Sequence, residues 1–186
     1  MLIVFGGRPG TGKTTISLLV AKRMNATYLR VDAIEQAIRN AAGGLAVGAS
    51  GYAVAQAIAD GNVGNGRIVV ADCVNPVADS RRGWRGVAAS RSVPLVDVEL
   101  ICSDIAEHRR RVTTRSTDIP GLVLPSWDAV MDLAYEPWDR PHLINDTARI
   151  APSDAADAVS RAVAHDFKLE RIRRRRKRSR VRENFC

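Results

Sequence analysis

A glycine-rich segment near the start of the sequence has the residue types and spacing of a phosphate-binding loop. Its residues are Gly7, Arg8, Pro9, Gly10, Thr11, Gly12, Lys13 and Thr14. They fit the pattern Gly-x-x-x-x-Gly-Lys-Ser/Thr at every position, between an apolar run and an amphipathic helical pattern that begins near Lys13. Glycines let successive backbone N–H groups converge on phosphate oxygens, and a helix N-terminus adds partial positive charge. We therefore expect this segment, with the adjacent Thr15, to bind a nucleotide. Lys13 would bridge the β- and γ-phosphates, and Thr14 would ligate Mg²⁺.

Two aspartates lie where apolar, β-branched runs end, namely Asp32 and Asp72. Ligands of an open parallel sheet bind at the carboxyl ends of its strands, so we expect both carboxylates near the nucleotide. Asp72 is expected to hold Mg²⁺, directly or through water. Each also has a structural alternative, because aspartate is a preferred helix N-cap and a common turn residue. In that case Asp32 would cap a helix over 33–41, and Asp72 would end its strand in a turn.

A basic segment over about 109–124 has the pattern of a hinged lid, since it starts helical and then becomes rich in Thr, Pro and Gly. Arg111 and Arg115 are four residues apart and so share one helical face. An arginine that closes over a nucleotide supplies positive charge to the transferring phosphoryl group in a site with little water. We expect Arg115, and with it Arg111, to be catalytic in this way. The alternative is a basic helix face in solvent, above all for Arg109 and Arg110.

Short β-branched runs alternate with helical patterns along the chain. The runs cover residues 2–5, 26–31, 67–72, 95–102 and 142–145. The helical patterns cover about 14–24, 33–41, 52–60, 79–90, 104–115, 126–134 and 153–165. This alternation predicts an α/β fold with a five-stranded parallel sheet and crossover helices. Glycine clusters at 43–51 and 61–66 predict loops on both sides of the third helix.

The net charge of +8 comes from one end of the chain. Residues 1–167 carry 18 basic and 18 acidic side chains, whereas residues 168–186 carry 10 basic and 2 acidic ones. We therefore predict one domain over 1–167 and a basic tail over 168–186 that is disordered or helical. The tail, mainly 168–182, is expected to bind nucleic acid or an anionic surface. The alternatives are a solvated helix extension and a terminus without a selected function.

Signals for secretion or membrane insertion are missing from the sequence. The first residues lack a basic region and a cleavage site, and no apolar run approaches the ~20 residues of a membrane span. Cys73, Cys102 and Cys186 are an odd number without metal-ligand spacing, which argues against disulfides or zinc. We expect a cytoplasmic protein without a membrane span.

Several classes of phosphate-loop protein are excluded because the sequence lacks motifs that these classes need. The lysines lie at 13, 22, 168 and 177, and none belongs to a guanine-reading Asn-Lys-x-Asp motif. An LSGGQ signature is also missing, and the chain is too short for the two-part module of a ring-forming ATPase. The compact nucleotide-kinase type remains.

Five segments, in this order along the chain, resemble those of small P-loop kinases. Beside the phosphate loop they are Val31-Asp32, the stretch 69–75, the pair Arg111 and Arg115, and the stretch 143–147. Over about residues 1–165 the chain resembles AAA_33, zeta-toxin-like and polynucleotide-kinase-like phosphotransferases, a family that includes chloramphenicol phosphotransferase, gluconate kinase and adenylylsulfate kinase. The resemblance implies a three-layer kinase-like fold, with helices on both faces of the sheet and a small lid. It also implies that ATP and Mg²⁺ are bound.

The same resemblance implies roles for single residues. Asp32 would accept or orient the proton of an acceptor hydroxyl, Asn75 would position the acceptor, and Arg149 would stack on the adenine. Many relatives carry arginine three residues after this aspartate, where the chain has Glu35. The expected activity is transfer of the ATP γ-phosphoryl group to a hydroxyl of a small molecule. The alternatives are a polynucleotide 5′-hydroxyl kinase and a nucleotide-binding regulatory module with little turnover.

Two further groups of residues have a structural and a functional interpretation. The group expected to form a solvated helix face is Arg81, Arg82 and Arg85. The second group is Trp127, Tyr135 and Trp138. We expect these aromatic side chains to form either an acceptor pocket or a satellite core under the lid.

Overall fold

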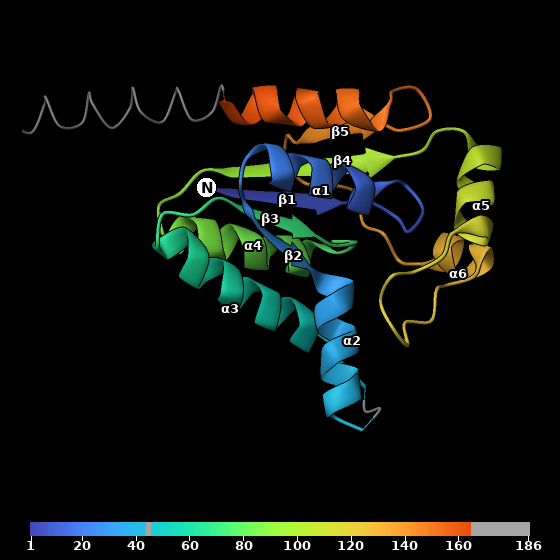
Figure 1. Ribbon diagram of the computed structural model, residues 1–186, viewed down its shortest axis with the longest axis horizontal. Helices are drawn as coiled ribbons and strands as arrows, with labels where there is room; N and C mark the ends of the chain where they lie inside the picture. Colours follow the sequence, from blue (N-terminus) through green and yellow to red (C-terminus); the bar gives the residue numbers. More distant parts are fainter. Residues whose placement is uncertain (44–45, 165–186) are drawn as a thin grey trace, which may run out of the picture.

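The computed structural model describes residues 1–43 and 46–164 and has five strands in one sheet (Figure 1). The strands are β1 (Leu2–Gly6), β2 (Thr27–Arg30), β3 (Val69–Asp72), β4 (Leu95–Ile101) and β5 (Leu143–Asp146). All neighbouring strands are parallel, and their order in the sheet is β2-β3-β1-β4-β5. The predicted five-stranded parallel sheet of an α/β fold is confirmed.

Helices cover both faces of this sheet. The helices of the chain are α1 (Lys13–Arg23), α2 (Val31–Ala41), α3 (Ser50–Gly64), α4 (Ala78–Ser90), α5 (Ile105–Thr114) and α6 (Trp127–Asp132), of which α5 and α6 lie at the end of the molecule (Figure 1). Residues 152–164 are also helical. One face packs against α1 and the helix over 152–164, and the other packs against α3 and α4. The three-layer arrangement is therefore confirmed.

Strand β1 lies at the centre of the sheet and is buried on both faces. Ile3 and Phe5 face the core under α1, whereas Leu2 and Val4 face the core under α3 and α4. All four side chains are fully buried. This is why the strand reads as a continuous apolar run instead of an alternating one.

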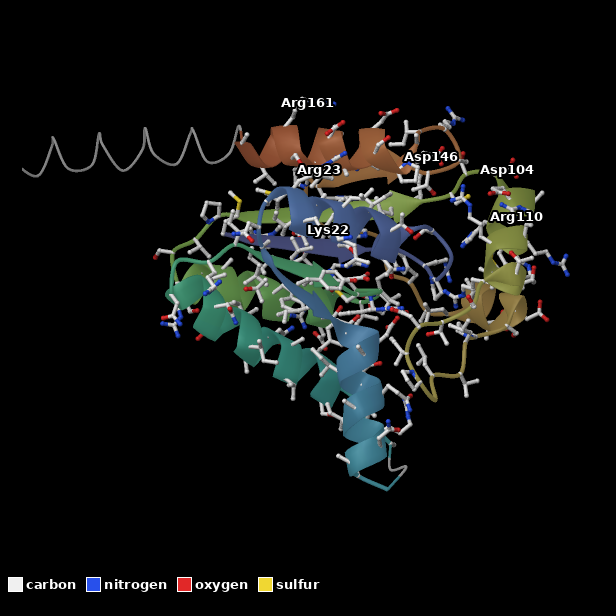
Figure 2. The ribbon with its side chains drawn as sticks, viewed as in Figure 1. Lys22, Arg23, Asp104, Arg110, Asp146 and Arg161 are labelled. Atoms are coloured by element: carbon white, nitrogen blue, oxygen red, sulfur yellow. The ribbon has the colours of Figure 1, made fainter. Side chains whose placement is uncertain are left out.

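The helix over 152–164 is attached to the body mainly by packing. Its buried positions, Ala155, Ala156, Val159 and Val163, recur with the spacing of one helical face. Arg23 of α1 lies beside this helix (Figure 2) and forms an ion pair of 2.9 Å with Asp157. Both partners are partly exposed to solvent, so the pair stabilises the fold by at most about 1 kcal/mol. The predicted basic tail over 168–186 lies outside the described residues.

Helix α3 is longer than the sequence predicted, because it continues through glycines that were expected to form a loop. It runs over Ser50–Gly64 instead of 52–60. Ala55, Ala59 and Val63 lie four residues apart and are buried against the sheet. This packing outweighs the low helix propensity of the glycines at its C-terminal end.

The lid forms the end of the molecule next to the carboxyl ends of the strands (Figure 1). It consists of α5, the connection over 115–126 and α6, so it begins a few residues before the predicted 109–124. Arg30, at the end of β2, donates a hydrogen bond of 2.6 Å to Asp118 in the connection. This ion pair joins the lid to the start of α2. Within the described residues, no helix is long and apolar enough to cross a membrane.

Candidate active site

The phosphate loop connects β1 to α1, as the sequence predicted. Gly7, Gly10 and Gly12 adopt positive φ angles of 134°, 87° and 86°. A Cβ atom at Gly10 would lie 2.5 Å from Cγ2 of Val112, so only glycine lets α5 pack this closely on the loop. The first turn of α1 has neither a side-chain cap nor an acidic residue. Its backbone N–H groups are therefore suited to bind the oxygens of a phosphate group.

Lys13 is buried at the start of α1 and lies near two carboxylates. Its Nζ donates a hydrogen bond of 2.9 Å to the carbonyl oxygen of Arg8. Burial lowers the pKa of Lys13, and the negative charges of Asp72 and Asp32 oppose this shift. The ammonium group therefore stands in a charged cluster at the base of the phosphate loop.

Asp72 ends strand β3 next to the phosphate loop, because Asp72 is paired in register with Phe5 of β1. It is 3% exposed, and its Oδ2 accepts a hydrogen bond of 2.7 Å from the hydroxyl of Tyr28. Thr14 lines the same cavity. Mg²⁺ is usually held by one or two carboxylate or hydroxyl oxygens together with substrate phosphates, so this donor set fits it. The described residues hold no group of three or more His, Cys, Asp or Glu suited to a metal ion.

Asp32 lies in the first turn of α2 and faces the cavity instead of capping the helix. The N-cap position is Arg30, and no side chain caps this end. The N-cap alternative for Asp32 is therefore wrong. Burial raises the pKa of Asp32, and Asp72 raises it further, while Lys13, Arg30 and Arg115 lower it.

The two lid arginines have different surroundings. Arg115 is the C-cap residue of α5, lines the cavity and is half-buried. Burial lowers its pKa, and the charge of Asp32 opposes this shift. Arg111 instead donates hydrogen bonds of 2.7 Å to Glu107, 2.9 Å to Oγ1 of Thr147 and 3.1 Å to the carbonyl oxygen of Thr147. Arg111 thus fastens the lid helix to the loop after β5, while Arg115 points into the site.

Arg8 and Arg149 were predicted to bind the nucleotide, and their side chains do not line the main cavity. Arg8 donates to carbonyl oxygens at the end of α6, including that of Leu133 at 2.9 Å. Arg149 is exposed and forms an ion pair of 3.1 Å with Asp146, the last residue of β5, which is labelled in Figure 2. Stacking of Arg149 on the adenine stays a prediction.

These groups surround one cavity of about 640 Å³. At one end it is lined by Pro9, Gly10, Gly12, Lys13, Thr14 and Thr15 of the phosphate loop. Farther from the loop lie Glu35 and Tyr52 of α2 and α3 and the lid residues Leu122 and Leu124, whereas Val130 and Leu133 line the cavity beside Arg8 of the loop. Asp32, Asp72 and Arg115 lie in its wall as well. The cavity therefore joins a phosphate-binding compartment to a second compartment beneath the lid.

The prediction that Arg81 is solvated is wrong. Arg81 is 1% exposed, because α4 buries the stripe Arg81, Trp84 and Ala88. Its guanidinium donates to the carbonyl oxygens of Asn75, Pro76, Glu136 and Pro137. It thereby joins the chain after β3 to the chain after α6. Arg82 and Arg85 are partly exposed and form ion pairs with Asp79 and Asp139, respectively.

Trp127, Tyr135 and Trp138 make structural contacts in two separate places. Trp138 stacks on His142 with ring centroids 4.5 Å apart and lies 4.5 Å below the guanidinium of Arg81. Its indole Nε1 donates to the hydroxyl of Tyr135. Trp127 meets the ring of His108 edge-on at 5.2 Å. None of the three aromatic side chains lines the main cavity in the described part of the chain.

Sequence reasoning missed several residues of the site. His108 Nε2 donates a hydrogen bond of 2.8 Å to the carbonyl oxygen of Pro9, which seats the lid helix on the phosphate loop. Tyr28 holds Asp72, and Tyr52 lines the acceptor end of the cavity, where Asn75 had been expected. Asn75 is fully buried and contacts Tyr52 through its backbone N–H. No motif marks these residues, because their roles depend on contacts between distant segments.

A family model described as an AAA domain, AAA_33, matches residues 2–133. The chain belongs to this family. Comparison with curated proteins gives no match. Among solved structures, a gluconokinase from Sinorhizobium meliloti 1021 has a TM-score of 0.63 and 19% identity, and the alignment covers 90% of this chain and 95% of that one.

The APS kinase CysC of Mycobacterium tuberculosis, in complex with AMPPNP and APS, has a TM-score of 0.65 and 19% identity, with 86% of this AAA_33 chain and 95% of that chain covered. Kti12 from Chaetomium thermophilum, in complex with ADP-AlF3, has a TM-score of 0.59 and 18% identity, with 87% and 98% covered. Likenesses at these identities establish the fold, which is that of P-loop kinases. The predicted resemblance to AAA_33 proteins is confirmed by the family model.

Proposed function

We propose that the protein is an ATP- and Mg²⁺-dependent kinase that transfers the γ-phosphoryl group of ATP to a hydroxyl of a small molecule. The observation that carries this proposal is the continuous cavity in which Lys13, Asp32 and Arg115 face one another. A phosphoryl group bound by the loop would lie between these cations and a carboxylate suited to receive a proton. Family membership and the P-loop kinase fold support the same conclusion.

The residues of the cavity divide the reaction between them. The backbone of the phosphate loop and Lys13 bind the phosphates, and Arg115 offsets the negative charge of the transferring group. Thr14 and Asp72 would hold Mg²⁺, which supplies further positive charge at the phosphates when bound. Asp32 orients the acceptor hydroxyl and accepts its proton as the new O–P bond forms. The bond between the γ-phosphorus and the bridging oxygen breaks, and ADP leaves.

Two contacts prepare the lid for this chemistry. His108 and Val112 pack α5 directly on the phosphate loop, so the C-terminal end of that helix carries Arg115 into the cavity. Apolar lid residues cover the other compartment and exclude water from the acceptor. Exclusion of water strengthens the interaction between Arg115 and the phosphoryl group and limits hydrolysis of ATP.

Fewer observations bear on the acceptor, the tail and the cellular location. A polynucleotide acceptor and binding through residues 168–182 stay predictions, since this segment lies outside the described residues. The cytoplasmic location stays a prediction as well. A nucleotide-binding module with little turnover is separated from a kinase by the following experiment.

The experiment measures acceptor-dependent ADP release by the full chain with Mg·ATP. Lys13→Ala should abolish release or weaken Mg·ATP binding, because it removes the lysine of the phosphate loop. Lys22→Ala is the matched control, since Lys22 is an exposed lysine of the same helix (Figure 2). ADP release and ATP binding at wild-type levels in Lys13→Ala would contradict the proposed function. So would Mg·ATP binding without release of ADP in the presence of any acceptor.

A further inference from the structure

The second compartment of the cavity has a carboxylate that the proposed phosphoryl transfer does not use. Glu35 lies one turn after Asp32 on α2, and both side chains line the cavity. Residues three apart on a helix have Cβ atoms about 5–6 Å apart on the same face. Helix α2 therefore presents two carboxylates to the cavity from one of its faces.

The side chain of Glu35 is held by a close approach of α3. A Cβ atom at Gly51 would lie 2.2 Å from Cγ of Glu35, so the glycine at the start of α3 leaves the space that this side chain occupies. Burial raises the pKa of Glu35, and the charge of Asp32 raises it further, while Arg39 opposes the shift. The negative charge of Asp32 beside Glu35 makes this part of the cavity more favourable for a positive group than for a negative one.

The cations that line the cavity already have other partners or roles. Those that line it are Lys13, Arg30, Arg111 and Arg115. Lys13 and Arg115 serve the phosphoryl group in the proposed function. Arg30 is bound to Asp118 at 2.6 Å, and Arg111 is bound to Glu107 and Thr147. Among the described residues that line the cavity, every cation thus has a partner or serves the phosphoryl group, and the donor left over, Nε of Arg30, is buried.

Arg39, the next basic residue along α2, does not change this balance. It donates a hydrogen bond of 2.6 Å to Oε1 of Gln36 and is not among the residues that line the cavity. An anionic acceptor would therefore meet Asp32 and Glu35 without a cation to pair with. An acceptor with a positive charge would instead compensate Glu35.

We propose that the acceptor is an amino alcohol, whose hydroxyl is phosphorylated at Asp32 and whose protonated amino group is bound by Glu35. This inference rests on the proposed kinase function. Because Asp32 and Glu35 lie one turn apart on α2, the amino group of such an acceptor is separated from the reacting hydroxyl by a short carbon skeleton. The apolar lid residues Leu122 and Leu124 contact the carbon skeleton between or beyond these groups.

Tyr52 supplies a second polar contact for such an acceptor. Its hydroxyl oxygen accepts a hydrogen bond of 2.8 Å from the backbone N–H of Asn75. Burial raises the pKa of Tyr52, so the hydroxyl keeps its proton and can donate it to an oxygen of the acceptor. A polyol or amino sugar with a further oxygen near its amino group would use this contact.

The test compares acceptors that differ in charge and share a skeleton. One set is glucosamine, N-acetylglucosamine and glucuronate, and the other is 4-amino-1-butanol, its N-acetyl derivative and 4-hydroxybutyrate. ADP release is measured with each compound and Mg·ATP, using the full chain. We expect turnover with the free amines and a KM at least about tenfold higher for the N-acetyl compounds, the size expected for a charge-assisted hydrogen bond.

Three variants connect this preference to Glu35. Glu35→Gln should raise the KM for the amines by about tenfold to a hundredfold and leave that for the N-acetyl compounds unchanged. Gly51→Ala should reproduce part of this loss without altering any charge, because its Cβ displaces Glu35. Asp79→Asn is the control, since it removes an exposed carboxylate on α4 and should have no effect.

The outcomes separate the inference from the function on which it rests. The inference is overturned if a neutral or anionic acceptor is turned over at least as well as the amine with the same skeleton. It is also overturned if Glu35→Gln uses the amines as well as wild type does. Either result leaves the proposed kinase function unaffected. If no compound releases ADP, binding is read from the shift in Tm that each amine causes with AMPPNP and Mg²⁺ present. A shift that Glu35→Gln abolishes supports the inference, and no Glu35-dependent shift overturns it.

Discussion

Replacement of Arg115 by methionine is the sharpest test of the catalytic arrangement. The side chain is half-buried in the cavity wall, and its Nε is buried without a hydrogen-bond partner among the described residues. The guanidinium therefore contributes little to the fold, and methionine keeps most of its apolar volume. We expect the free energy of unfolding to change by no more than about 1 kcal/mol, as for other weakly paired charges.

The effect on turnover should be far larger. An arginine that meets the phosphoryl group in a site with little water contributes about 10³ in rate, which corresponds to about 4 kcal/mol of transition-state stabilisation. Because this interaction strengthens in the transition state, Arg115→Met should lower kcat much more than it raises the KM for ATP. The two expected energies hardly overlap, so one variant distinguishes a catalytic arginine from a surface one.

The assay is steady-state ADP release with the amino alcohol that gives the highest turnover in the acceptor comparison. Urea unfolding of each variant is measured alongside. Arg109→Ala is the control, because Arg109 is exposed on α5. Arg111→Met should behave differently again, since Arg111 holds the lid helix to Thr147. We expect it to lower stability and to raise the KM for ATP. If kcat of Arg115→Met stays within about threefold of wild type, the loss of transition-state stabilisation is less than about 1 kcal/mol. That result would refute the catalytic role and indicate that Arg115 is an ordinary surface residue of the lid.

Three further predictions follow from the same contacts. Asp32→Asn should keep Mg·ATP affinity, measured by calorimetry, and lower kcat by about 10² or more, because it removes the proton acceptor; unchanged kcat would exclude that role. Arg81→Met should lower the free energy of unfolding in urea by about 3 kcal/mol or more, because it leaves buried carbonyl oxygens unpaired, whereas the exposed Arg82→Met should change it by less than about 0.5 kcal/mol. Hydrogen bonds from two neighbouring arginines lower the pKa of Glu107 to about 2. A lowered pKa stabilises the folded state above the unfolded pKa and loses this effect as the pH falls. The Tm difference between wild type and Glu107→Gln should therefore be present at neutral pH and vanish on acidification towards pH 2.

The phosphate loop and the sheet were predictable because their causes are local or periodic. Six consecutive positions separate the end of β1 from α1, and glycines at three of them permit the positive φ angles that the turn requires. The central strand reads as an unbroken apolar run because helices cover both of its faces. Each of the five β-branched runs became a strand, and the spacing of buried positions marked the helices that cover them.

The roles of the basic residues were decided by tertiary contacts. Arg81 and Arg82 are adjacent in sequence, yet one is buried among carbonyl oxygens and the other is paired at the surface. Arg111 and Arg115 share a helical spacing and both line the cavity, yet Arg111 is bound to Glu107 and Thr147, whereas Arg115 is the C-cap residue of α5 and is the lid arginine left for a ligand. A side chain's sequence neighbours fix its helical face, whereas the segment packed against that face decides whether it finds solvent, a carbonyl or a carboxylate.

The acceptor compartment is the part that sequence reasoning could least foresee. Glu35, Tyr52 and the lid residue Leu124 come from three segments that are far apart in the chain and line one cavity. The order of the strands brings α2 and α3 to the same edge as the phosphate loop, and the ion pair between Arg30 and Asp118 brings the lid to them. A phosphate can be bound by the backbone of one continuous loop, so its site consists of consecutive residues that a sequence motif can reveal. An acceptor is enclosed by side chains from several elements, so its site exists only once those elements have packed.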